Sequence, residues 1–256
     1  MTMFSIVIST HKRPALLSRA ITSILDQLFK DVQIIVVSDV SCVDSYRVAS
    51  TLLADGDLFL QRQGDQGPSQ SRDLGVQSAR GEYVIFLDDD DALSPTYLER
   101  AAQVATPTTL TYTNFVVFDE ERDGNTLRVR AVHNKYLDGI PLKRLWVKNF
   151  IPFSAIVFPL AAVRTRQSDA GLAQMEDWDF LLSAATEYQL RHAAIIGPII
   201  YSRNEGNRSQ DCPNLLAAIY RQIYERYLPP SAEIQAARQA LLQSVSPTIA
   251  DDVSGP

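Results

Sequence analysis

Short, mostly apolar segments alternate with amphipathic segments through the first hundred residues of the chain. The apolar segments fall at residues 4–9, 32–37, 58–61 and 83–87, and their length and their many Val and Ile residues are typical of buried strands. The segments between them are expected to form helices at residues 14–27, 43–53 and 68–80. This alternation predicts an α/β fold whose central sheet is mostly parallel, with right-handed crossovers.

The pattern changes near residue 105. Strands are then expected at residues 110–118, 127–132, 154–158 and 193–201, with a turn over 120–125 that joins the first two as a hairpin. Helices are expected at residues 96–104, 178–188, 215–228 and 232–244. We therefore expect one domain over residues 1–210, in two halves that meet near 105, and a helical extension over 211–256 with a frayed tail.

Bulk composition narrows the function classes. The chain of 256 residues is 46% hydrophobic and carries a net charge of −6, which disfavours non-specific nucleic-acid binding. Cys42 and Cys212 are far apart and predict neither a disulfide framework nor a metal site. The longest apolar run, 193–201, is too short to span a membrane, and the N-terminus shows no secretory signal. We expect a cytoplasmic protein, and contact with the inner face of a membrane stays open.

Four consecutive aspartates, residues 88–91, follow the apolar run at 83–87. Like charges this close repel one another, and a bound cation removes the penalty. Carboxylate oxygens select Mg²⁺ or Mn²⁺, which keep open positions for phosphate oxygens. Ligands of open α/β sheets bind at the carboxyl ends of strands, so the pattern indicates a nucleotide-diphosphate site. The alternative is a solvated acidic turn, which the preceding strand and the helix signal at 94–96 disfavour.

Two other expected strands end in polar residues. Ser9 and Thr10 close the first strand, and Asp39 follows the second. Because the carboxyl ends of parallel strands share one edge of the sheet, these residues are expected to lie beside the aspartates. Asp39 has two interpretations, which the sequence leaves open: its carboxylate accepts the imide N–H of uracil, or it caps the next helix.

In these segments the chain resembles the family 2 glycosyltransferases, which have the GT-A fold and invert the configuration at the anomeric carbon. Four segments carry the resemblance in the family's order, at residues 5–17, 32–39, 67–75 and 79–91. The likeness is close over residues 4–99 and patchier as far as 209. It implies a nucleotide-binding half at 1–104 and an acceptor-binding half at 105–210.

The resemblance also implies roles for individual residues. Thr10 matches a position that contacts the nucleotide, Asp39 the acid that recognises uracil, and Arg72 a basic residue near the base and diphosphate. The alternative for Arg72 is an ion pair on the helix surface with Asp73 or Asp65.

The aspartates match the family's Asp-X-Asp signature. Asp88 and Asp90 correspond to its ends, with Asp88 towards ribose and metal and Asp90 as the direct metal ligand. Asp89 is also assigned to donor binding. Asp89 and Asp91 are both expected to support Asp88 and Asp90 from behind, without contacting the metal. Asn204 falls where many family members have a histidine that completes the metal shell, and an amide oxygen can also bind such metals.

A second acidic pair, Glu176 and Asp177, matches the family's Glu-Asp motif below the acceptor site, with Asp177 as the catalytic base. Glu176 could exchange roles with it. The alternative is that both acids merely occupy the favourable first turn of a helix. Trp178, which follows, is expected to pack in the core.

The resemblance implies transfer of a sugar from a nucleotide-diphosphate donor, UDP-linked by preference, to a hydroxyl of a glycan or lipid-linked glycan, with Mn²⁺ or Mg²⁺ as cofactor. The family's common setting is synthesis of bacterial surface polysaccharide, lipopolysaccharide or other glycans. Two alternatives are a sugar-phosphate nucleotidyltransferase, for which residues 10–14 lack the glycines, and an inactive sugar-nucleotide-binding subunit, which Ser38 and Asn204 favour as departures from the family pattern. A homodimer is left open.

Overall fold

The computed structural model describes residues 2–63, 67–123, 126–169, 171–172, 174–203 and 213–245. Over these residues the strands form one sheet in the order β3-β2-β1-β4-β8-β6-β9-β5, with β7 paired to β6. The strands are β1 (Phe4–Thr10), β2 (Val32–Ser38), β3 (Leu58–Gln61), β4 (Tyr83–Asp88), β5 (Ala92–Leu93), β6 (Thr109–Asp123), β7 (Thr126–Lys135), β8 (Ile156–Pro159) and β9 (Gln189–Arg203). The helices are α1 (Pro14–Leu25), α2 (Val43–Leu52), α3 (Gly67–Ser78), α4 (Tyr97–Val104), α5 (Leu160–Arg164), α6 (Glu176–Ala185), α7 (Pro213–Arg226) and α8 (Ala232–Val245), with short 3₁₀ turns η1 (Leu142–Trp146) and η2 (Phe153–Ala155). The α/β prediction is confirmed.

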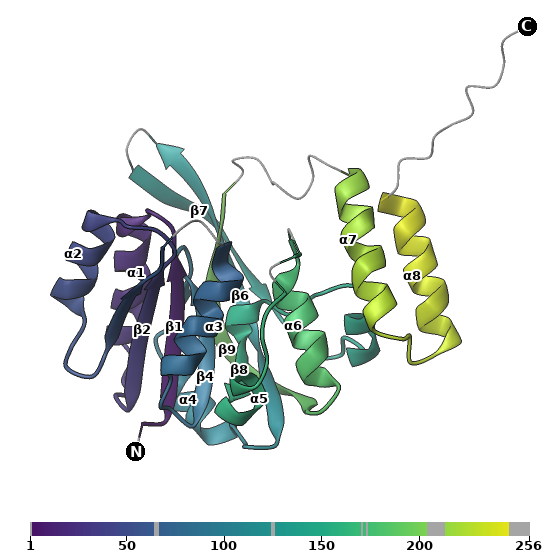
Figure 1. Ribbon diagram of the computed structural model, residues 1–256, viewed down its shortest axis with the longest axis horizontal. Coiled ribbons are helices and arrows are strands. Elements are labelled where there is room, and N and C mark those ends of the chain that lie inside the picture. The colour runs from purple at the N-terminus through teal and green to yellow at the C-terminus, as the bar shows by residue number, and fades with distance from the viewer. Residues whose placement is uncertain are drawn as a thin grey trace, which may run out of the picture.

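Helices cover both faces of the sheet (Figure 1). Side chains alternate between the faces along β1: Ile6 and Ile8 pack with Leu17 of α1 and Leu98 of α4, whereas Val7 packs with α3 on the other face. Both sets are fully buried, which explains why the centre of β1, Ile6 to Ile8, is apolar on both faces.

The pairing is parallel in the first half and mixed beyond it. β3, β2, β1 and β4 are parallel neighbours, as predicted. β8 then runs antiparallel to β4 and β6, and β9 is parallel to β6 and antiparallel to β5. The sheet therefore changes character near residue 105, where the hydrophobic pattern changes.

The hairpin is longer than the sequence predicts. The turn expected over 120–125 is wrong for its first residues, because β6 continues to Asp123 and β7 begins at Thr126. The charged residues there belong to a strand ladder: Glu120 is buried, and it pairs with Arg19 and Arg203. In Figure 1 the hairpin rises above the body of the sheet.

Four short elements were not anticipated: β5, α5, η1 and η2. Each has five residues or fewer, which is too short for a hydrophobic period to be visible. The late strand β9 also extends beyond the apolar run at 193–201, because it pairs with β6 from Thr109 to Glu120.

One glycine sets the position of α3. A Cβ on Gly75 would lie 2.3 Å from Val7 Cγ1, so only a residue without a side chain allows α3 to approach β1 this closely. This close approach holds the N-terminal turns of α3 beside the carboxyl ends of the strands.

The last two helices lie at the opposite end of the molecule from α1 and α2 (Figure 1). Arg238 of α8 is buried and donates to the carbonyl oxygens of Trp146 at 2.8 Å and Tyr227 at 2.7 Å. It therefore links α8 to η1 and to the end of α7. Among the helices that the structure describes, none has the length and apolar character that crossing a membrane requires.

Candidate functional site

The carboxyl ends of β1, β2 and β4 meet at one edge of the sheet. Thr10 is the register partner of Ser38, and Ser9 is the partner of Asp88. The backbone N–H of Asp39 donates to the carbonyl oxygen of Thr10 at 3.2 Å, which ties the two loops together. The structure thus brings together the strand-end residues that the sequence analysis singled out.

A cavity of about 370 Å³ opens at this edge. It is lined by Ser9, Thr10, His11, Arg13, Asp39, Gly67, Pro68 and Ser71. Asp39 is buried, and its Oδ1 lies 2.9 Å from His11 Nδ1. The helix-cap alternative for Asp39 is wrong, because α2 is preceded by Cys42 and receives no side-chain cap bond. The Asp39 carboxylate therefore lines the cavity with one oxygen held by His11, and it does not cap the next helix.

The four aspartates occupy different environments. Asp89 has no exposed surface, accepts a 2.6 Å hydrogen bond from Thr10 Oγ1 and pairs with Arg13, and burial raises its pKa to about 6. Asp91 is also buried, and its Oδ1 accepts from the backbone N–H of Tyr201 at 3.2 Å. The side chains of Asp88 and Asp90 are 44% and 32% exposed. The solvated-turn alternative therefore does not hold, since two of the four carboxylates point into the protein.

Arg72 joins the aspartates to the second acidic pair. Its Nη2 donates to Asp88 Oδ1 and its Nη1 to Glu176 Oε1, each at 2.9 Å. Burial alone would lower the pKa of this guanidinium, but Asp88, Glu176 and Asp177 outweigh it and raise the pKa.

The ion pair that was the alternative for Arg72 is not formed with Asp73. The Asp73 carboxylate instead accepts from the backbone N–H of Ser168 at 3.0 Å and from its hydroxyl at 2.8 Å. Asp65, the other suggested partner, lies outside the described residues.

Glu176 and Asp177 begin α6. Met175, directly before them, has a left-handed backbone with φ of 63°, which turns the chain sharply into the helix. Asp177 is half-buried and its Oδ1 accepts from the backbone N–H of Trp178 at 2.8 Å. Burial, reinforced by the neighbouring Glu176 carboxylate, raises the pKa of Asp177 to about 6. Trp178 is fully buried and donates to Leu145 O, so the core prediction is confirmed.

The side chains at this edge include oxygen donors that could hold a metal. In the part of the chain that the structure describes, no group of three or more His, Cys, Asp or Glu side chains is arranged around a common metal position. Asp88 and Asp90 nevertheless present partly exposed carboxylates, and such hard oxygen donors suit a divalent cation whose other ligands are water and phosphate. Asn204, the expected third ligand, lies outside the described residues.

The loop after β1 contributes residues that the sequence pattern did not single out. A histidine in such a turn is commonly solvated, but His11 contacts Asp39. Arg13 was not singled out, yet it pairs with both Asp89 and Asp90. The signal was present in the three basic residues, His11 to Arg13, that directly follow an apolar strand.

Arg72 is expected to stabilise the fold as well as the site. Arg72→Met leaves Glu176, which is 17% exposed, and the more exposed Asp88 without their buried partner. We expect the free energy of unfolding in urea, without added metal, to fall by about 3 kcal/mol. Arg47→Met is the matched control, because Arg47 is 73% exposed and pairs with an exposed acid, and it should cost under about 1 kcal/mol. Equal stability of the two variants would contradict this account of Arg72.

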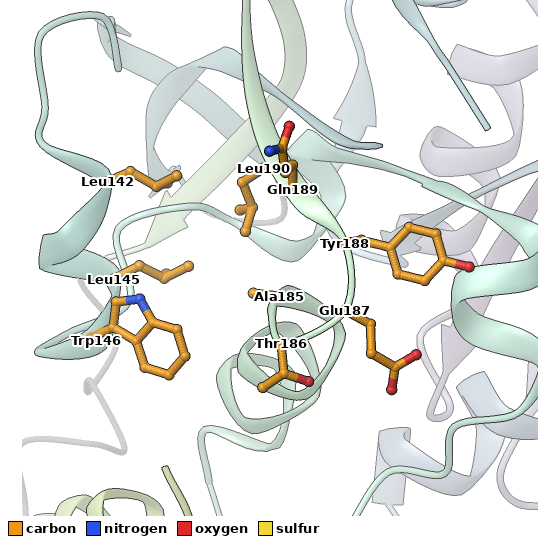
Figure 2. Close-up of a pocket in the computed structure, with 9 residues that line it drawn as sticks. All are labelled: Leu142, Leu145, Trp146, Ala185, Thr186, Glu187, Tyr188, Gln189 and Leu190. Carbon is orange, nitrogen blue, oxygen red and sulfur yellow. The ribbon is translucent and has the colours of Figure 1, made fainter. Parts of the chain in front are cut away.

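A second cavity of about 420 Å³ lies at the other end of α6. Figure 2 shows Leu142, Leu145, Trp146 and Leu190 around it, with the Glu187 carboxylate directed away from them. This cavity begins where α6 ends, roughly 15 Å along the helix from Glu176. Its apolar lining separates it in character from the acidic edge of the sheet.

The sequence profile described as Glycosyl transferase family 2 matches residues 5–165. A GalNAc(5)-diNAcBac-PP-undecaprenol beta-1,3-glucosyltransferase of Campylobacter jejuni is 43% identical over 96 residues, covering 36% of this chain and 31% of that protein. The uncharacterized glycosyltransferase YwdF of Bacillus subtilis is 24% identical over 224 residues, covering 87% of this chain and 81% of that protein. The chain thus spans about a third of the first relative and most of the second.

Solved structures share the fold. A structure of S. aureus TarS 1-349 in complex with UDP-GlcNAc matches with a TM-score of 0.66 at 17% identity, covering 93% of this chain and 70% of that one. The mannosyltransferase PcManGT of Pyrobaculum calidifontis, in complex with GDP-Man and Mn²⁺, matches with a TM-score of 0.63 at 15% identity, covering 94% of this chain and 72% of that one. Together with the profile match over residues 5–165, this likeness shows that the chain has the GT-A fold and belongs to glycosyl transferase family 2.

Proposed function

We propose that the protein transfers a sugar from a UDP-linked donor to an acceptor hydroxyl with inversion at the anomeric carbon. The observation that carries the proposal is the meeting, at one edge of the sheet, of a cavity containing Asp39 with the partly exposed Asp88 and Asp90 and with Asp177. Arg72 connects the acidic turn to the start of α6, because it contacts both Asp88 and Glu176.

The donor would lie along the strand ends. In this proposal uracil occupies the 370 Å³ cavity, where Asp39 accepts its imide N–H and Thr10 borders the nucleotide. Arg72 lies beside the diphosphate and holds Asp88 in place. Asp89 has no exposed surface, so we place it behind the donor, where it holds Thr10 and Arg13.

The metal proposed here is Mn²⁺ or Mg²⁺, which Asp88 and Asp90 would hold, with Asn204 as a further oxygen ligand. When bound, it would supply positive charge to the departing diphosphate. A TarS structure holds UDP-GlcNAc and the PcManGT structure holds GDP-Man and Mn²⁺, which supports a nucleotide-sugar donor and a divalent cation.

Asp177 is proposed as the catalytic base. It accepts the proton of the acceptor hydroxyl while that oxygen bonds to the anomeric carbon and the bond from this carbon to the diphosphate breaks. Its pKa of about 6 lets it be ionised at neutral pH and still be a stronger base than an ordinary aspartate. Glu176, held by Arg72, is the proposed positioning partner of Asp177.

The acceptor is proposed to be a glycan or lipid-linked glycan in the synthesis of bacterial surface polysaccharide, lipopolysaccharide or a related glycan. The Campylobacter relative, whose printed name includes an undecaprenol-linked glycan, supports this class. We assign donor binding to residues 1–104 and acceptor binding to 105–210, with 211–256 as an added helical extension. The cytoplasmic setting and the homodimer stay predictions.

A thermal-shift panel tests the donor proposal. UDP, GDP, CDP and dTDP are each added with and without Mn²⁺. At 100 times its dissociation constant a ligand stabilises the fold by about 2.7 kcal/mol, which gives a clear shift of the melting temperature. We expect the largest shift with UDP and Mn²⁺ together. A protein whose melting temperature no nucleotide moves would contradict the donor site and favour the inactive-subunit alternative.

A further inference from the structure

The guanidinium of Arg13 lies between the nucleotide cavity and the acidic turn. Its Nη1 donates to Asp90 Oδ2 at 2.9 Å, and its Nε donates to Asp89 Oδ2 at 3.2 Å. Its Nη2 lies 2.5 Å from Asp89 Oδ1. The planar fork of arginine therefore makes a two-point contact with Asp89 and a one-point contact with Asp90. The same side chain also lines the 370 Å³ cavity.

The two carboxylates hold Arg13 unequally. Asp89 has no exposed surface, so losing its cation would leave a buried charge without a partner, which is strongly unfavourable. Asp90 is 32% exposed and is held at one point, and exposed ion pairs of this kind contribute little. Asp90 is therefore the partner that Arg13 can release at small cost.

A divalent cation and Arg13 would compete for Asp90. Both bring positive charge to the same carboxylate, and two cations at one oxygen repel each other. The guanidinium is planar and rigid, so Nη1 keeps its place while Nε and Nη2 stay on Asp89, and the 32% exposed Asp90 side chain is the group that can turn away. The Nη1 atom left without Asp90 would then be free to donate to a diphosphate oxygen at the cavity that Arg13 lines.

We propose that Arg13 is an anchored, exchangeable counter-ion: it stays on Asp89, neutralises Asp90 in the free protein, and exchanges Asp90 for an oxygen of the donor diphosphate when the metal draws Asp90 away. The inference rests on the proposed function, because it takes Asp90 as a metal ligand. It makes Arg13 the residue through which metal binding and nucleotide binding favour each other.

The test measures two affinities in Arg13→Gln. Mn²⁺ binding without nucleotide is followed by the electron paramagnetic resonance signal of free Mn²⁺, and UDP binding at saturating Mn²⁺ by calorimetry. We expect the variant to bind Mn²⁺ about 5-fold more tightly, since a competing cation is gone, and UDP about 10-fold more weakly, since a charged donor is gone. These changes have opposite signs, whereas damage to the fold would weaken both affinities.

Two further variants keep the test decisive. Arg13→Lys retains a charge for Asp89 but cannot reach both carboxylates, so it should also tighten Mn²⁺ binding while losing less UDP affinity. Arg47→Gln, an exposed arginine on α2, should change neither affinity. Unchanged or weaker Mn²⁺ binding in both Arg13 variants, or UDP binding equal to the wild type, would overturn the inference. A wild-type protein that binds neither Mn²⁺ nor UDP would overturn the proposed function with it.

Discussion

Asp177→Asn is expected to remove sugar transfer while leaving donor binding intact. The amide keeps the shape of the side chain but cannot take the proton of the acceptor hydroxyl. A general base contributes about 10²- to 10⁴-fold to the rate, so we expect turnover to fall by roughly 10³-fold. UDP affinity in Mn²⁺ should stay within about 2-fold of the wild type, because Asp177 begins α6 and does not line the nucleotide cavity.

The control for this variant is Asp179→Asn. Asp179 lies two residues further along α6 and pairs with Arg226 of α7, away from Arg72. We expect Asp179→Asn to lower the free energy of unfolding and to retain turnover. Full activity of Asp177→Asn would show that another group takes the proton, with Glu176 as the first candidate.

The Asp177 carboxylate also makes turnover depend on pH. Turnover should rise as the pH increases through about 6 and level off above 7, because Asp177 must be ionised to act as a base.

The effect of pH on stability has the opposite sign. Asp89 and Asp177 have pKa values of about 6 in the folded state and 3.8 ordinarily, so the folded chain binds more protons and the unfolding free energy falls as the pH rises from 4 to 6. Melting temperatures at pH 5 and 7.5 check this.

Asp90→Asn is expected to abolish the metal dependence of UDP binding. Asp90 is partly exposed and makes its side-chain bond to Arg13, which remains anchored on Asp89, so the fold should be retained. The neutral amide is a much weaker ligand for Mn²⁺ than a carboxylate. We expect UDP affinity in Mn²⁺ to fall at least about 100-fold, to the level measured in EDTA.

The matched control is Asp44→Asn, which removes a carboxylate on α2 that also pairs with an arginine but is more exposed, at 68%. It should leave UDP affinity and its response to EDTA unchanged. UDP affinity in Asp90→Asn that still falls when EDTA is added would mean that other residues hold the metal.

The nucleotide half of the fold could be predicted because its signals are local. β1, β2 and β4 are buried on both faces, so they stand out as mostly apolar segments, and each ends in a polar residue at the same edge. Four of the predicted nucleotide- or metal-binding residues lie at or directly after those strand ends: Thr10, Asp39, Asp88 and Asp90.

The features that the sequence did not predict depend on contacts between residues that are far apart in the chain. Glu120 looked like part of a turn because its partners, Arg19 and Arg203, lie 101 and 83 residues away. Arg13 looked like a loop residue because its partners are 76 and 77 residues away in the acidic turn. Charges that are neutralised by distant residues cannot be distinguished in a single sequence from charges that face water.

A crystal structure with UDP and Mn²⁺ tests the central claim most directly. The account predicts uracil in the cavity beside Ser9 and Gly67, with its imide nitrogen about 3 Å from the Asp39 carboxylate. It also predicts Mn²⁺ bound to Asp90. Uracil bound elsewhere, or Mn²⁺ held by residues other than Asp88 and Asp90, would contradict the account.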